Sequence, residues 1–169
     1  LLNDEEVRSL VDELDRAIML LSARKIGALL VLERDMGLND ISATGVQIDG
    51  LVSADFLMNV FIPNTPLHDG AAVIRGKRMI AAGCLLPLTD NRTLSTELGT
   101  RHRAAIGLSE QCDALIVVVS EETGTVSVAE NGRIIRHLDS DMLKAHLRPI
   151  FAPKTAGLKD MVANWRKKK

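Results

Sequence analysis

The sequence is poor in aromatic residues: it contains no tyrosine, one tryptophan and three phenylalanines among 169 residues. Domains that bind single-stranded nucleic acid usually stack the bases on such rings, so this scarcity disfavours an OB-fold or RRM-like domain. An excess of charge is also missing, because 21 Lys and Arg nearly balance 22 Asp and Glu, for a net charge of −1. No overall field attracts polyanions, and we expect no nucleic-acid partner.

Other absences narrow the class of protein further. Cys84 and Cys112 have neither CxxC nor metal-site spacing, which is typical of free thiols in a reducing cytoplasm. The longest apolar run, residues 79–86, falls far short of the roughly 18 residues that span a membrane, and no signal peptide opens the chain. Walker A and GxGxxG motifs are absent too. Because the chain begins at Leu1 without a methionine, we expect a cytoplasmic piece of a longer protein.

Apolar periodicity predicts four helices. A 3.6-residue stripe follows the acidic start of the chain, and Ser53 offers an N-cap for the second helix. Pro149 is expected to close the last helix, since proline breaks the hydrogen bonds of a helix interior. The predicted ranges are 4–24, 54–62, from about 96 or 100 to 111, and from about 140 to 147.

Strands are predicted between these helices. The apolar run 27–33 is rich enough to be a central strand buried on both faces, and Asn131-Gly132 suits the tight turn of a hairpin. The other ranges are short strands within 38–52, a hairpin over 73–86, and strands at 114–119, 125–129 and 133–138. We therefore expect an α/β fold, a single globular domain over 1–150 with a mixed central β-sheet flanked by helices on both faces. We expect residues 151–169 to form a basic, partly ordered extension.

Three polar clusters stand beside apolar elements, and each offers groups used in phosphate chemistry. They are His68-Asp69-Gly70-Ala71, the cationic cluster Thr100-Arg101-His102-Arg103, and the acidic loop Ser120-Glu121-Glu122. A helix start with two guanidiniums favours an anion, and carboxylates with an imidazole can hold a divalent metal. If the sheet brings the clusters together, they supply the groups that phosphoryl or nucleotidyl transfer requires.

Each cluster also has an ordinary structural explanation. Asp69-Gly70 is most often merely a turn, a lone His68 is commonly a surface residue, and the two glutamates usually just solvate a loop. Residues two apart do not share a helix face. One of Arg101 and Arg103 could therefore pair with a glutamate of the acidic loop instead of binding phosphate.

The motifs Asp69-Gly70-Ala71 and Arg101-His102-Arg103 resemble the two signature motifs of diadenylate cyclase domains. The longer strings GALLVLERD, IPNTPLHDGA, LGTRHRAAIG and VVVSEETG are similar to the CdaA-type, membrane-tethered subgroup. This resemblance covers roughly residues 20–138. It implies that two ATP molecules are condensed into cyclic di-AMP with release of two pyrophosphates, across a head-to-head homodimer, with a divalent metal such as Mn²⁺, Mg²⁺ or Co²⁺.

The resemblance also assigns roles to residues. Asp69 and His68 would hold the metal, Gly70 and Ala71 would border the nucleotide, and Leu86 would contact adenine. Phosphates and ribose would be held by the cationic cluster, and its Arg101, His102 and Arg103 would form the catalytic set together with Asp69. Phosphate or metal would also be contacted by the acidic loop. The residues that would hold phosphate, ribose or metal, or take part in catalysis, thus include Asp69, Thr100, Arg101, His102, Arg103, Ser120, Glu121 and Glu122.

One departure and one alternative accompany this resemblance. Relatives carry an aromatic residue where this chain has Leu85, which bears on how adenine is held. The subgroup's membrane helices are missing here, so we expect the cytoplasmic domain of a tethered protein, with regulatory protein partners. The alternative function is a non-catalytic sensor of adenine nucleotides. A sensor needs phosphate donors but no metal-holding Asp69, so the carboxylates favour an enzyme.

Overall fold

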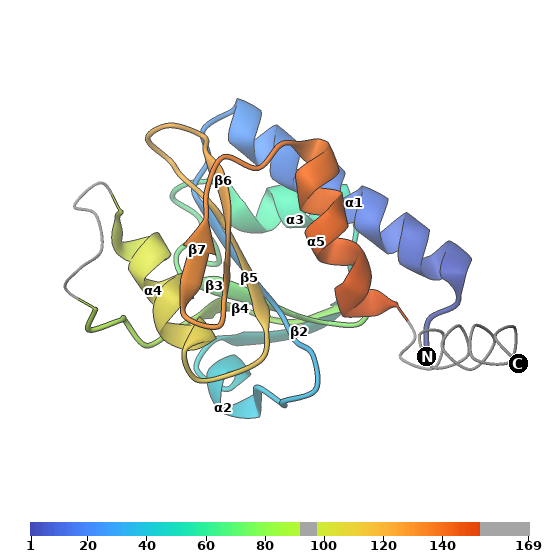
Figure 1. The fold of residues 1–169 in the computed structure, drawn as a ribbon, viewed down its shortest axis with the longest axis horizontal. Helices are drawn as coiled ribbons and strands as arrows, with labels where there is room; N and C mark the ends of the chain where they lie inside the picture. Colours follow the sequence, from blue (N-terminus) through green and yellow to red (C-terminus); the bar gives the residue numbers. More distant parts are fainter. Residues whose placement is uncertain (92–97, 153–169) are drawn as a thin grey trace, which may run out of the picture.

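The computed structural model describes residues 1–91 and 98–152, and its centre is a seven-stranded sheet in the order β2-β4-β3-β1-β5-β6-β7 (Figure 1). Only β1 and β3 are parallel among the pairs of this sheet. The strand bounds are β1 Ala28–Leu32, β2 Val46–Leu51, β3 Ala71–Arg75, β4 Arg78–Cys84, β5 Leu115–Val119, β6 Val126–Glu130 and β7 Arg133–Ile135.

Strand β1 occupies the middle of the sheet, as its continuous apolar sequence predicts. All five of its residues are buried. Leu30 pairs with Ala72 of β3 on one side and with Val117 of β5 on the other. Alternate residues of β1 therefore enter two separate cores, one on each face of the sheet.

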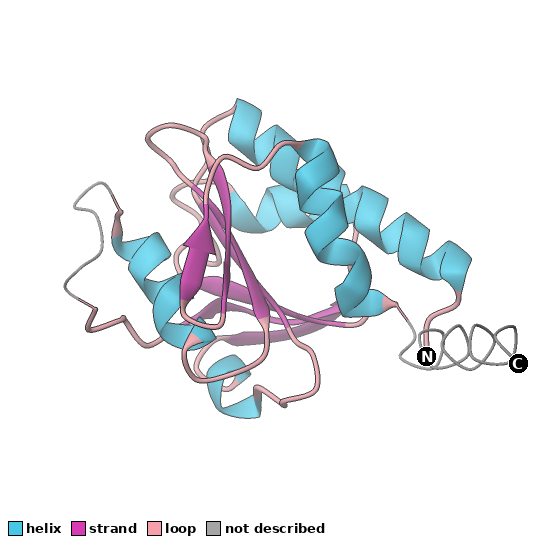
Figure 2. Ribbon diagram, in the orientation of Figure 1, coloured by secondary structure: helices cyan, strands magenta, loops and turns pink. Residues whose placement is uncertain are grey.

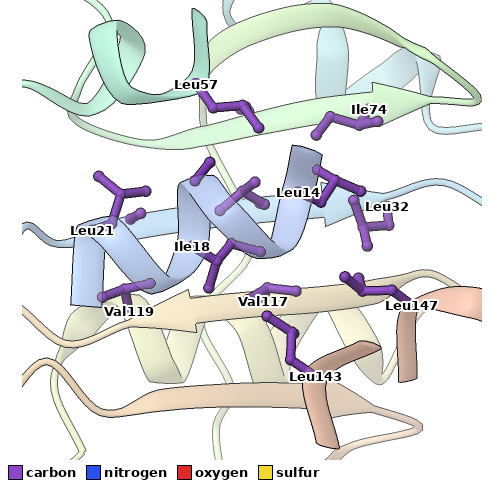
Figure 3. Close-up of a cluster of buried hydrophobic side chains, with 14 of the residues drawn as sticks. Leu14, Ile18, Leu21, Leu32, Leu57, Ile74, Val117, Val119, Leu143 and Leu147 are labelled. Carbon is purple, nitrogen blue, oxygen red and sulfur yellow. The ribbon is translucent and has the colours of Figure 1, made fainter. Parts of the chain in front are cut away.

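Three helices cover the first face: α1 (Asp4–Ala23), α3 (Ala54–Phe61) and α5 (Ser140–Phe151). Helix α1 begins with a capping box in which Asn3 accepts a hydrogen bond from the Glu6 amide at 2.8 Å. Its apolar stripe is fully buried at Leu14, Ile18 and Leu21, and these side chains meet those of the underlying strands (Figure 3). The stripe of α1 is thus the centre of the larger core.

Helix α4 (Thr100–Ser109) and the short α2 (Asn39–Ser42) lie on the second face, so the sheet is enclosed between two helical layers (Figure 2). The segment 87–89 crosses α4 at Gly107, where an added Cβ would lie 2.0 Å from the Pro87 carbonyl oxygen. The Thr89 amide donates to the Arg103 carbonyl at 3.1 Å. This crossing fixes α4 and its N-terminus relative to β4.

Several local predictions are confirmed. Ser53 accepts from the Phe56 amide at 3.1 Å, and Asp139 accepts from the Met142 amide at 2.8 Å, so both cap their helices. Asn131 and Gly132 have φ of 53° and 77°, as a type I′ hairpin turn requires. The single α/β domain with a mixed sheet and helices on both faces is also confirmed.

Other local predictions are wrong. Helix α5 continues through Pro149 to Phe151, because the buried Leu147 and Phe151 bind it to the core. Residues 38–52 form α2 and one strand instead of strands alone. Strands β4 and β7 end earlier than expected, at Cys84 and Ile135. The alternative helix start at Thr96 and most of the extension lie outside the described residues.

Two further observations concern the cysteines and the character of the helices. Cys84 and Cys112 are free thiols. None of the helices in the described part of the chain combines the length and apolar character that a membrane crossing requires.

Candidate functional site

The three polar clusters meet at one edge of the sheet, and the strand directions explain why. Strand β3 runs parallel to β1, whereas β5 runs antiparallel to it, with Ala28 opposite Val119. The residues before β1, before β3 and after β5 therefore share an edge. A pocket of about 430 Å³ opens there. Its lining consists of Asp69, Gly99, Thr100, Arg101, His102, Val119, Ser120, Glu121 and Glu122.

The N-terminus of α4 forms the cationic wall of the pocket. Gly99 occupies the N-cap position in an extended conformation, has no side chain that could cap the helix, and is followed by no acidic residue in the first turn. The first amides of a helix have no intrahelical partners, and together with the helix dipole they attract an anion. Thr100 and Arg101 stand at this end, so the wall suits a phosphate group.

Arg101 forms an ion pair with the acidic loop. Its Nη1 lies 3.4 Å from Glu121 Oε2, and the two side chains are 23% and 66% exposed. This is the alternative pairing that the spacing of Arg101 and Arg103 suggested. An ion pair so open to water typically contributes about 0–1 kcal/mol, so a phosphate could compete with Glu121 for the guanidinium.

His102 is the buried member of the cationic cluster, with 5% of its surface exposed. Its Nε2 is enclosed and has no hydrogen-bond partner among the described residues. Burial, and after it the charges of Arg136 and Arg101, lowers the pKa of His102 below its ordinary value. The imidazole is therefore neutral at neutral pH, and the positive charge of the cluster comes from its arginines.

Only Asp69 of the first cluster lines the pocket. The half-buried His68 donates from Nδ1 to the Thr65 carbonyl at 2.7 Å, which leaves Nε2 as its lone-pair nitrogen. Gly70 has φ of +105°, and an added Cβ would lie 2.7 Å from the Cys84 carbonyl oxygen. Its missing side chain thus makes room for β4. Ala71 is fully buried in the second core.

Two further residues assigned by the resemblance lie outside the pocket lining. Arg103 accepts the Thr89 amide through its carbonyl, so its backbone anchors the crossing segment. Leu86 is partly buried against the second core, beside Leu85, which is 70% exposed. Of these two leucines, Leu85 exposes more of its apolar side chain to solvent.

The acidic loop is a compact turn that follows β5. The Ser120 hydroxyl accepts from the amides of Glu122 and Thr123, each at 3.3 Å, and the Gly124 amide donates to the Ser120 carbonyl at 2.9 Å. Ser120 is therefore occupied in shaping the loop, while Glu121 and Glu122 also line the pocket.

The donor set is compatible with a hard divalent cation. Asp69, Glu121 and Glu122 line the same pocket, and carboxylate oxygens are ligands for Mg²⁺ and Mn²⁺. Within the described residues, no three His, Cys, Asp or Glu side chains are already gathered as a metal site.

Two residues of the site region escaped the sequence analysis as site residues. Val119 lines the pocket, and Arg136 lies close enough to influence His102. Gly99, the flexible glycine that the sequence places at the start of the cationic helix, lines the pocket as well. Val119 and Arg136 carry no local signal, because only the pairing of strands and the packing of α4 near β7 bring them here.

Sequence comparisons identify similar proteins. A model of the DAC family, described as "DisA bacterial checkpoint controller nucleotide-binding", matches residues 15–134. The chain is 45% identical over 166 residues to Cyclic di-AMP synthase CdaA of Bacillus subtilis, covering 98% of this chain and 61% of that protein. It is 39% identical over 163 residues to a diadenylate cyclase of Listeria monocytogenes, covering 96% and 60%. The chain thus spans about three fifths of these curated relatives.

A structural comparison gives a similar result. The crystal structure of a double mutant of DacA from Staphylococcus aureus matches with a TM-score of 0.87 and 41% identity. The match covers 89% of this chain and 100% of that one.

Proposed function

Because this chain belongs to the DAC family of nucleotide-binding domains, we propose that it is the catalytic domain of a diadenylate cyclase. Its reaction is the condensation of two ATP molecules into cyclic di-AMP and two pyrophosphates. The observation that carries the proposal is the single pocket in which Asp69, the cationic start of α4 and the acidic loop meet. The names of the relatives from Bacillus subtilis and Listeria monocytogenes support the same activity.

In the proposed reaction, each 3′-hydroxyl oxygen attacks the α-phosphorus of the other ATP. A new phosphorus–oxygen bond forms, the bond to the bridging oxygen of pyrophosphate breaks, and the hydroxyl proton leaves. Asp69, with His68 as a neighbour, would hold a divalent ion such as Mn²⁺, Mg²⁺ or Co²⁺. Such an ion lowers the pKa of an attacking hydroxyl and neutralises phosphate charge.

The side chains of the pocket divide the remaining tasks. Thr100, Arg101 and the amides of α4 bind the phosphates, where fixed donors stabilise the charge that develops on phosphate oxygens. The acidic loop contributes Glu121 or Glu122 to the metal. We also assign Gly70, Ala71, Leu86, His102, Arg103 and Ser120 to the nucleotide site. Of these, Gly70, Ala71 and Ser120 would shape the backbone around the nucleotide.

A homodimer is part of the proposal. Each chain offers one such pocket for one ATP, whereas the reaction joins two. Two protomers facing each other would place each 3′-hydroxyl beside the other's α-phosphate, which replaces a random encounter by a fixed geometry. The DacA and CdaA relatives support this arrangement only through their similarity.

The alternative function is a sensor that binds adenine nucleotides without reaction. The carboxylates in the pocket distinguish the two possibilities. A sensor gains nothing from Asp69 and Glu121 beside bound phosphates, since uncompensated carboxylates repel them. With a divalent cation the same carboxylates become useful, and the pocket contains three of them.

The test is a product assay. The protein is incubated with ATP and Mn²⁺, and the products are identified by mass spectrometry. We expect cyclic di-AMP from the wild type and none from Asp69→Asn, which keeps the shape of the side chain but removes the charge that holds the metal. Circular dichroism and ATP binding serve as controls for folding. ATP binding without product in the wild type would identify a sensor.

The setting of the domain is also proposed. The sequence predicts a catalytic domain over residues 1–150 and an extension over 151–169; because Phe151 ends α5 and is buried in the core, we assign it to the catalytic domain and let the extension follow it. The cytoplasm, where ATP is made and thiols stay reduced, agrees with the two free cysteines. Tethering to a membrane and control by regulatory proteins rest on the resemblance to the CdaA-type subgroup.

A further inference from the structure

The junction between α1 and β1, residues 22–27, lies at the same sheet edge as the pocket. Gly27 immediately precedes Ala28, which pairs with Val119 of the pocket lining. Gly27 is buried and has no unusual backbone angle that would explain a glycine. The reason for its missing side chain must be sought in what fills the adjacent space.

The guanidinium of Arg101 fills that space. An added Cβ at Gly27 would lie 2.5 Å from Arg101 Nη1, 2.6 Å from Cζ and 3.0 Å from Nη2. All three nearest atoms thus belong to a single planar group. The same Nη1 reaches Glu121 at 3.4 Å. The guanidinium is therefore held between the backbone of Gly27 and the acidic loop.

The other end of the same junction holds the acidic loop. Ser22 Oγ donates to the Gly124 carbonyl at 2.5 Å, and an added Cβ at Gly124 would lie 2.4 Å from the Ser22 carbonyl oxygen. One short stretch of chain thus contacts both the Arg101 guanidinium and the end of the turn that carries Glu121.

We propose that Gly27 is a positioning residue, whose bare backbone holds the Arg101 guanidinium where it can bind ATP phosphate. This inference rests on the proposed function for the identity of the ligand. A methyl group at position 27 would push the guanidinium by on the order of 1 Å, and displacements of that size can cost about a hundredfold in rate. Because the displaced atoms are the tip of a flexible side chain, the fold should lose little stability.

The experiment compares Gly27→Ala with Gly37→Ala. Gly37 is exposed, and an added Cβ there would meet nothing within 4 Å, so it controls for the loss of a glycine. ATP affinity is measured by calorimetry with Mg²⁺ and 3′-deoxy-ATP, an analogue that lacks the attacking hydroxyl and cannot react, and thermal unfolding is measured without ligand. We expect Gly27→Ala to lose about tenfold or more in ATP affinity at a nearly unchanged melting temperature, and Gly37→Ala to change neither.

A second measurement needs no nucleotide. The Nε–Hε resonance of Arg101, assigned by its loss in Arg101→Lys, should move in Gly27→Ala and stay in place in Gly37→Ala. An unmoved resonance, or an unchanged ATP affinity beside a wild type that binds, overturns the inference. If the wild type itself binds no ATP, the proposed function fails, and the resonance alone still decides whether Gly27 places Arg101.

A third variant keeps the inference testable if Gly27→Ala does not fold. Without the guanidinium, the methyl group at position 27 has room, so Gly27→Ala combined with Arg101→Ala should unfold at the same temperature as Arg101→Ala alone. If the combined variant folds while Gly27→Ala does not, Arg101 is the group that occupies the space. If neither folds, another group needs that space and the inference is wrong.

Discussion

The Arg101 guanidinium lies beside the backbone of Gly27 and the carboxylate of Glu121, and we propose that it also binds the phosphates of the substrate. Replacing Arg101 by a shorter side chain would remove these three contacts, which differ in their effects on stability and affinity. Losing the ion pair should cost little stability, since Glu121 is largely in water. Losing a charged hydrogen bond to phosphate should cost about 1.5–3 kcal/mol, or roughly ten- to more than a hundredfold in affinity. Function and stability therefore separate at this residue.

Arg101→Lys tests that separation, because a lysine keeps the charge but loses the planar, two-pronged contact. We expect its ATP affinity to fall by at least about tenfold at an almost constant melting temperature. Arg103→Lys is the matched comparison and should affect ATP affinity less, since Arg103 is outside the pocket lining. A lower melting temperature with intact affinity in Arg101→Lys would mean that Arg101 is a brace and not a phosphate ligand.

His102 leads to a prediction about pH. Burial, and after it Arg136 and Arg101, lowers its pKa in the folded protein, whereas in the unfolded chain the imidazole binds a proton near pH 6.5, about its ordinary pKa. Below that pH the unfolded state holds more protons than the folded state, so acidification lowers the free energy of unfolding. His102→Gln should flatten this decrease.

Urea unfolding of the wild type and His102→Gln, from about pH 7.5 to about pH 5, measures the difference. His146→Gln, on α5 and outside the pocket lining, controls for the loss of any imidazole. Identical pH slopes in the wild type and His102→Gln would contradict the prediction.

At the level of whole elements, the segment that crosses α4 depends on Gly107. Alanine favours a helix over glycine by about 1 kcal/mol, so Gly107→Ala would ordinarily stabilise α4. Here the new Cβ would lie 2.0 Å from the Pro87 carbonyl oxygen, a backbone atom that cannot rotate away. Overpacking of this kind costs about 1–3 kcal/mol and occasionally more. We therefore expect a net loss in the free energy of unfolding, measured by urea denaturation.

Gly37→Ala is again the control for Gly107→Ala, since its added Cβ has open space. A stabilised Gly107→Ala would show that the crossing segment moves aside easily, and that the N-terminus of α4 is not fixed by it.

Elements with a strong apolar pattern could be predicted from the sequence, and those set by packing could not. The buried run of β1, the stripe of α1 and the Asn131-Gly132 turn each carry a local signal that decides the structure. Pro149 gave a local signal too, but the burial of Phe151 outweighs it. Helix α2 has four residues, which is too short for a period to appear.

The candidate site shows the same division. Its polar clusters were found because each stands beside an apolar element, and strand directions then bring them to one edge. Nothing in the sequence relates Gly27 to Arg101 or Arg136 to His102, since these contacts join residues far apart in the chain. Asp69 could be named from its motif, whereas the anchoring roles of Gly70 and Ser22 required the fold.

For the molecule as a whole, the proposal requires two copies. If neither pocket alone holds both substrates, the rate per protomer should rise with protein concentration and level off when the dimer is fully formed. Initial rates over a dilution series, compared with a dimer dissociation constant from analytical ultracentrifugation, test this. A rate per protomer that stays constant well below that constant would show that one chain suffices.

If each chain binds one nucleotide, as proposed, the dimer has a consequence for inheritance. A bacterium that carries both a normal gene and a copy encoding Asp69→Asn would assemble its subunits at random. With equal expression, only about a quarter of its dimers would contain two normal chains. A mixed dimer can form at most one of the two bonds that close the product ring. The defective copy should therefore be dominant, since it leaves about a quarter of the dimers fully normal, whereas the loss of one of two normal gene copies would leave about half.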